Sequence, residues 1–242
     1  AMWNKRVNEK EMRKDLKKSL EELKTDYIDI YMLHRDDPDT DVAVAVETFN
    51  AMHEEGNIGA FGASNWTHTR IEEANEYAYK HNLIPFSVSS PNFCLARQVE
   101  DPWGGGCVNI SGPENQEARA WYEKNQMPVI AYASLGRGFF SGKMKSEYAD
   151  HASDYLDSFA MTGYACSDNF ERLRRCEIIA EKYGVTVAQI AMNWIFSHPL
   201  NIFAIASMSK ADRMKANREA LLLQLSDEEI AYLNLETPEF CG

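Results

Sequence analysis

One histidine in this sequence stands where a buried strand is expected to end. The apolar run 27–33 leads directly into His34, and three charged residues, 35–37, follow it. An imidazole at the carboxyl end of a parallel strand can orient a substrate or move a proton, because that edge of an α/β barrel carries the active site. The alternative is a loop that merely begins with polar residues, and position alone does not decide between the two.

A second group of residues has the chemistry to hold a phosphorylated ligand. The segment 134–138 combines two glycines with an arginine, and small residues let a backbone approach a pyrophosphate. Ser209, Lys210 and Arg213 stand at the expected start of a helix, where backbone amides, the helix dipole and cations favour an anion. Taken singly, each of these is as readily a turn glycine or a solvated charge, so only their joint arrangement argues for a ligand site.

The elements that must position these residues alternate between strand and helix. Five short, nearly continuously apolar runs predict strands of a parallel sheet that is covered on both faces: 27–33, 58–64, 85–90, 128–133 and 202–207. Helical spacing predicts helices over 9–24, 41–54, 69–79, 114–124, 170–182, 187–197 and 212–222. A capping box at Ser226 predicts a last helix to about Leu235. This alternation indicates βα units and an α/β fold.

Two long segments, 101–113 and 137–167, are predicted to be irregular. Both follow the carboxyl ends of predicted strands, as His34 does. In a parallel barrel the long loops at that end form the active-site face, and this shared location favours a functional role for the histidine over a solvated one.

Composition excludes several classes of protein. The 242 residues carry a net charge of −12, which argues against a nucleic-acid partner, since binding a polyanion needs a basic face. No stretch of about 20 apolar residues is present, so no membrane partner is expected. The five cysteines have no CxxC spacing, which favours reduced thiols over a metal site or a disulfide framework. With no secretory signal in residues 1–24, we expect a cytoplasmic protein.

Four segments resemble, in this order, motifs of the aldo-keto reductase family. They are DYIDIYMLHRDDP, GASNW, VIAYASLGRGFFSGK and SMSKADRMKAN, which begin at Asp26, Gly62, Val129 and Ser207. Each motif is moderately specific, and together they span nearly the whole chain. The resemblance implies a (β/α)8 TIM-barrel type of fold and hydride transfer between a nicotinamide and a carbonyl carbon. It also implies NADP(H) as the cofactor, with NAD(H) less favoured.

The resemblance assigns roles to individual positions. His34 matches the histidine that orients the carbonyl, Tyr132 offers a ring face to the nicotinamide, and Ser64 with Asn65 binds its carboxamide. The other cofactor-binding positions it implies are Ser90, Ser134, Leu135, Gly136, Arg137, Gly138, Ser207, Ser209, Lys210, Arg213 and Asn217. Ser90 is a departure, because many members carry glutamine there, and the shorter side chain reaches the carboxamide less well.

Three further catalytic residues of the family have no match in this sequence. The family uses an aspartate, a tyrosine and a lysine from strands that precede the histidine strand, whereas no strand is predicted before residue 27. Tyr27, Tyr31 and Lys143 do not repeat that constellation. We therefore expect residues 1–242 to form a single, N-terminally truncated aldo-keto reductase-like domain, a partial, open barrel of about five parallel strands with surrounding helices.

Such a domain has consequences for activity and for partners. Without the three residues the chain alone is expected to be inactive, and a small carbonyl compound is the expected substrate of the complete protein. Bare sheet edges favour self-association of the chain. Alternatively, a missing N-terminal segment or a partner chain is expected to cover the open barrel.

Two alternatives remain open at this stage. One is a non-catalytic nucleotide-binding or interaction module derived from an aldo-keto reductase. The other is a different barrel enzyme, a hydrolase or lyase that uses His34 with Asp36 and Asp37. It is less favoured, because those carboxylates are expected to cap the next helix.

Overall fold

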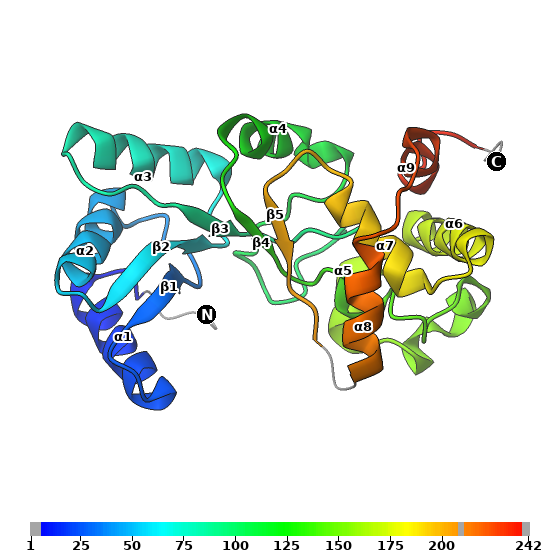
Figure 1. Cartoon of the computed structure of the whole chain (residues 1–242), viewed down its shortest axis with the longest axis horizontal. Coiled ribbons are helices and arrows are strands. Elements are labelled where there is room, and N and C mark those ends of the chain that lie inside the picture. Colours follow the sequence, from blue (N-terminus) through cyan, green and yellow to red (C-terminus); the bar gives the residue numbers. More distant parts are fainter. Residues whose placement is uncertain (1–5, 208–210, 239–242) are drawn as a thin grey trace. The chain divides into compact units, whose positions relative to one another are not determined.

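The computed structural model of the chain describes residues 6–207 and 211–238, and it contains helices packed on a parallel sheet (Figure 1). The strands are β1 (Ile28–Leu33), β2 (Ile58–Ser64), β3 (Val88–Ser90), β4 (Val129–Ala131) and β5 (Ile202–Ala204). The helices are α1 (Glu9–Leu23), α2 (Val42–Glu54), α3 (His68–Lys80), α4 (Gln116–Asn125), α5 (Ser158–Tyr164), α6 (Ser167–Tyr183), α7 (Val187–Phe196), α8 (Ala211–Ala220) and α9 (Asp227–Leu233). Three 3-10 helices, η1 (Pro113–Asn115), η2 (Gly136–Gly138) and η3 (Ser146–Asp154), lie in the loops.

The five strands follow one another in the sheet in the order of the sequence, β1-β2-β3-β4-β5. β1 pairs with β2, β2 with β3, and β3 with β4, each in the parallel direction. Each strand is joined to the next by at least one helix, as a parallel arrangement requires. The expected α/β class with five parallel strands is confirmed.

The described chain divides into two compact units. The first comprises residues 6–91 with 106–108 and 127–129. In it α1 packs beside α2, α2 packs beside α3, and α2 also contacts β2 (Figure 1). Its core is aromatic: Phe49 stacks on Phe61 at 5.0 Å between ring centroids, and Phe86 meets both rings edge-on. This core fixes β2 against the helices and so positions the carboxyl ends of the strands.

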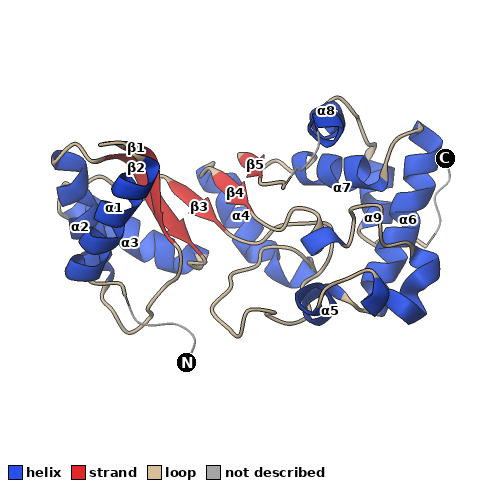
Figure 2. Ribbon diagram, turned by 90° about the horizontal axis from the view of Figure 1, so that it is seen from below, coloured by secondary structure: helices blue, strands red, loops and turns tan. Residues whose placement is uncertain are grey.

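The second unit comprises residues 92–105, 109–126 and the described residues from 130 onward. Here α6 packs against both α7 and α9, and α7 packs against α8 (Figure 2). The predicted capping box is confirmed at the start of α9, where Ser226 Oγ accepts from Glu229 N at 3.2 Å and Glu229 Oε2 accepts from Ser226 N at 2.7 Å. A second box, between Thr186 and Gln189, begins α7.

The sequence-based boundaries hold for most elements, and the differences have physical reasons. The prediction that 137–167 is irregular was wrong, because α5 and two 3-10 helices form there. Seven residues are too few to show helical periodicity, and α5 depends on its cap, in which Asp157 accepts from Ala160 N. The expectation that all strands are covered on both faces was also wrong. It holds for β3, whereas Ile30 of β1 is 49% exposed.

β1 lies at one end of the sheet. β1 pairs with β2 from Ile28 to Leu33, and it is the first strand in the sheet order, so its other edge has no strand partner among the described residues.

In the described part of the chain no helix is long and apolar enough to cross a membrane. Of the cysteines, the four that the structure describes are free thiols.

Candidate active site

The parallel register of the first unit brings three predicted site residues to one edge of the sheet. Leu33 pairs with Ala63, and Ser64 pairs with Ser90, so His34, Ser64 and Ser90 all lie at the carboxyl ends of their strands. The Ser64 hydroxyl donates to the Ser90 carbonyl at 2.8 Å. The structure thus brings these three predicted residues to the same edge of the sheet.

Asn65 ties this edge together. Its Nδ2 donates to the His34 carbonyl and to Ser64 Oγ, both at 3.1 Å, and its Oδ1 accepts from Val108 N at 3.1 Å. The residue is 5% exposed and adopts a left-handed conformation with φ of 58°, which asparagine tolerates better than most residues. Its amide therefore braces the backbone beside His34 through hydrogen bonds of both Nδ2 and Oδ1.

His34 itself is exposed beside a cavity of about 820 Å³. The cavity is lined from α1, β1 and the loop after β1, and its wall includes Met12, Tyr31 and Phe49. Partial desolvation, and secondarily the Arg35 charge, lower the pKa of His34 below its usual value, so the ring is neutral at pH 7. A neutral imidazole can donate one N–H to a carbonyl oxygen, which is the role that the resemblance assigns to it.

The two carboxylates after His34 have other partners. Asp36 Oδ2 lies 3.4 Å from Arg70 Nε, and Asp37 Oδ2 accepts from Thr40 Oγ1 at 3.0 Å. The expectation that they cap α2 was wrong, because Asp41 caps it by accepting from Ala43 N. No group of three or more His, Cys, Asp or Glu in the described chain could hold a metal ion.

Sequence reasoning missed one contact close to His34. Arg35 Nη1 lies 2.8 Å from the sulfur of Cys107, a residue of the glycine-rich segment that also contributes Val108. Seventy-two residues separate the two side chains, so no local pattern signals the contact.

In the second unit, the predicted pyrophosphate segment forms a tight turn after β4. Ala133, Gly136, Arg137 and Gly138 all have positive φ, and the Leu135 carbonyl accepts from the amides of Gly138 and Phe140 at 3.1 Å. Gly136 is buried, and a Cβ there would lie 3.1 Å from Phe139 Cβ, whereas a Cβ on Gly138 would meet only Ser141 Oγ, at 3.8 Å. Ser134 is 1% exposed, and its hydroxyl donates to the carbonyls of Ala131 and Ile205.

Arg137 is held by an aromatic cluster. Its guanidinium lies 4.9 Å from the Phe159 centroid and 5.7 Å from the Trp103 centroid, and Nη2 donates to Asp157 at 2.7 Å. Trp103 in turn meets the ring of Tyr132 edge-on at 6.0 Å. Trp103, Asp157 and Phe159 were not predicted to contact Arg137, because they lie in the two segments that were predicted to be irregular and no spacing in the sequence connects them to Arg137.

The last group of predicted cofactor residues lies between β5 and α8. Ser207 and Arg213 are exposed, and Asn217 is half-buried one turn further along α8. Arg213 forms no ion pair with any described carboxylate and is open to a ligand. The predicted residues Ser209 and Lys210 lie outside the described residues.

Comparison with known proteins identifies the family. The model of the aldo/keto reductase family matches residues 1–235. The chain belongs to the aldo/keto reductase family. A solved aldo-keto reductase, a thermostable enzyme crystallised with the inhibitor epalrestat, superposes with a TM-score of 0.69 over 96% of this chain and 68% of that chain. Its sequence identity is 22%, so this likeness concerns the fold.

Curated aldo/keto reductase relatives match most of this chain and a smaller part of their own. Aldo-keto reductase YhdN of Bacillus subtilis is 24% identical over 94% of this chain and 63% of that protein. Norsolorinic acid reductase of Aspergillus flavus is 25% identical over 95% of this chain and 53% of that protein. A putative voltage-gated potassium channel subunit beta of Schizosaccharomyces pombe is 23% identical over 89% of this chain and 60% of that protein. The chain thus spans about 60% of the length of such relatives.

Proposed function

We propose that this chain carries the NADP(H)-binding part and the carbonyl-orienting histidine of an aldo-keto reductase that acts on a small carbonyl compound. The observation that supports this most is the group of hydrogen bonds at the carboxyl ends of β1, β2 and β3 in the first unit. His34 stands there beside Ser64, Asn65 and Ser90, at the positions that the family resemblance assigns to the site. A neutral imidazole at a strand end can direct an N–H at a carbonyl oxygen while hydride is supplied by the bound dinucleotide.

The second unit offers groups that fit the phosphates and rings of NADP(H). Gly138 has no side chain at the turn after β4, where a Cβ would meet only Ser141 Oγ at 3.8 Å, and Arg137 is the preceding residue. Arg213, exposed on the first turn of α8, offers a planar, permanently charged donor group to a 2′-phosphate. Tyr132, half-buried at the end of β4, offers a ring. These groups favour NADP(H) over NAD(H), since only the former carries the 2′-phosphate.

The proposal also holds that the proton donor comes from residues that this sequence does not contain, on the same polypeptide or on a partner chain. The described lining of the cavity at His34 includes one tyrosine, Tyr31, and no lysine. Burial raises the pKa of Tyr31, which is the opposite of what a neighbouring lysine would do to a general acid. Cover of the β1 edge by such a segment, by a partner chain or by a second copy is part of the same proposal.

The second candidate is a non-catalytic nucleotide-binding module. It is favoured by Asn65, whose amide is committed to His34, Ser64 and Val108 rather than open to a nicotinamide carboxamide. The name of the fission-yeast relative, a putative channel subunit beta, indicates that the family also contains proteins named for a partner.

Two measurements on the full chain separate these functions. NADPH fluorescence is titrated at moderate salt with the native chain, with Arg213→Ala, and with Lys215→Ala as a matched control from the same helix, since Lys215 lies 3.8 Å from Glu219. Saturable binding that only Arg213→Ala weakens supports the dinucleotide site, and absence of binding refutes it. Turnover of a reactive aldehyde by the chain alone would contradict the proposal that the proton donor is absent from this sequence.

A further inference from the structure

The second unit contains a cavity of about 280 Å³, and none of its lining residues was assigned to the candidate active site. Its wall contains two arginines, Arg119 of α4 and Arg172 of α6, and the imidazole of His198 after α7. Leu95, Trp194 and Leu235 supply apolar surface. α6 packs directly on α7 and on α9, which bring most of these side chains together (Figure 1).

The two guanidinium groups have only neutral partners. Arg172 is 6% exposed, and it donates to Asn169 Oδ1 at 3.2 Å and to the Asn234 carbonyl at 3.5 Å. Arg119 donates from Nη1 alone, to the carbonyls of Ile110 at 2.7 Å and Gly112 at 2.5 Å. A guanidinium has five N–H donors, so each group keeps several without an acceptor among the described residues. Neither arginine forms an ion pair with a described carboxylate.

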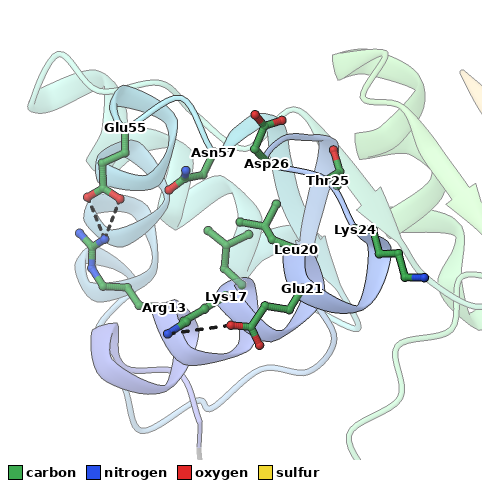
Figure 3. Close-up of a pocket in the computed structure, with 10 residues that line it drawn as sticks. Arg13, Lys17, Leu20, Glu21, Lys24, Thr25, Asp26, Glu55 and Asn57 are labelled. Atoms are coloured by element: carbon green, nitrogen blue, oxygen red, sulfur yellow. Dashed lines mark hydrogen bonds and ion pairs between the residues drawn. The ribbon is translucent and has the colours of Figure 1, made fainter.

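Several other arginines of the chain are paired with carboxylates. Arg175, one turn from Arg172, is paired with Glu171 at 2.7 Å. In the groove beside α1, Arg13 binds both oxygens of Glu55, and Lys17 faces Glu21 (Figure 3). The chain has 37 acidic residues against 25 basic ones, so carboxylates are plentiful, yet none pairs with the two arginines of the cavity in the part that the structure describes.

Burial makes this arrangement costly without an anion. Desolvation lowers the pKa of both Arg119 and Arg172, but an arginine keeps its proton at any physiological pH. Buried charges in proteins are normally paired, because removing an ion from water costs several kcal/mol. Glu236 also lines the cavity, but it is exposed, and its Oε1 accepts from Asn234 Nδ2 at 3.0 Å. Two positive charges therefore line one small space, and although Glu114 acts electrostatically on both arginines and Asp168 on Arg172, no described carboxylate forms an ion pair with either of them.

We propose that this cavity is a binding site for a small organic anion, whose carboxylate or phosphate group contacts Arg119 and Arg172. Its apolar part lies against Leu95, Trp194 and Leu235. The volume is close to the lower end for ligand pockets, about 300 Å³, which restricts the ligand to a few non-hydrogen atoms beyond the charged group. His198 donates from Nδ1 to the Trp194 carbonyl at 2.9 Å, and the neutral ring then offers Nε2 as an acceptor to a ligand hydroxyl.

The test uses the indole N–H signals of the full chain, labelled with nitrogen-15. Trp194 lines the cavity and donates from Nε1 to Asn234 Oδ1 at 2.8 Å, so its signal reports on the site, and Trp194→Phe assigns it. Inorganic phosphate and butyrate are titrated separately at constant ionic strength. The variant Arg119→Gln removes one charge, and Arg174→Gln is the matched control, since Arg174 is exposed and paired with Glu171.

The expected result is a saturable shift of the Trp194 signal with at least one probe, weakened about tenfold or more by Arg119→Gln and unchanged by Arg174→Gln. Saturation with phosphate alone identifies a phosphate ester as the ligand class, and saturation with butyrate alone identifies a carboxylate. No saturable shift with either probe overturns the proposal, and so does equal affinity in Arg119→Gln. Should that variant fail to fold, Leu235→Phe, which fills the cavity and keeps both charges, must abolish the shift.

Discussion

Removal of the Asn65 side chain tests whether this residue holds the edge of the sheet that carries His34. Asn65→Gly keeps the left-handed backbone conformation, because glycine adopts positive φ without strain. It deletes the hydrogen bonds to the His34 carbonyl, to Ser64 Oγ and from Val108 N. At about 1 kcal/mol net for each bond, the free energy of unfolding should fall by about 3 kcal/mol.

The chain provides a matched control for this substitution. Asn82 has almost the same φ, 55° against 58°, but it is exposed, and its side chain forms no hydrogen bond with a described residue. Asn82→Gly should therefore change the free energy of unfolding by only a few tenths of a kcal/mol. Urea unfolding followed by circular dichroism measures both variants under the same conditions. If Asn65→Gly costs no more than Asn82→Gly, the bracing role of Asn65 is refuted.

Three further predictions concern packing, capping and pH. Gly62→Ala should prevent pairing of β2 with β3 and cost several kcal/mol in urea unfolding, because a Cβ there would lie 1.8 Å from the Val88 carbonyl oxygen. Ser226→Ala should cost about 1 kcal/mol in the same assay through loss of the cap of α9. Burial lowers the pKa of His198 below its unfolded value of 6.5, so the folded state binds fewer protons and stability should fall as pH drops from 6.5 toward 5. His198→Gln should flatten that slope, and an unchanged slope would exclude His198 as its source.

Strand order and the edge that carries the site could be predicted from the sequence because both depend on local patterns. Continuous apolar runs mark parallel strands, and parallel strands end at the same edge. The ends of β1, β2 and β3, which carry His34, Ser64 and Ser90, accordingly lie at one edge. The exposed Ile30 shows the limit of such patterns, since an apolar run does not reveal whether a strand lies at the end of a sheet.

The contacts that shape each site could not be predicted, because they join distant segments. Arg35 meets Cys107, and Arg137 is held by Trp103 and Phe159, through loops without periodicity. The cavity of Arg119 and Arg172 is assembled from α4, α6, the end of α7 and the segment after α9. Asn65 was expected to bind a ligand, and its role in bracing the backbone is evident only from its three hydrogen bonds.

The most direct test of the central claim is the ratio of the NADPH and NADH dissociation constants, measured by calorimetry on the full chain. We predict that NADPH binds tighter than NADH by about tenfold or more, since a charge-assisted pair with the 2′-phosphate contributes about 1.5–3 kcal/mol. Arg213→Ala should largely abolish this difference. Absence of saturable binding of either dinucleotide, or equal affinity for both in the native chain, would contradict this prediction.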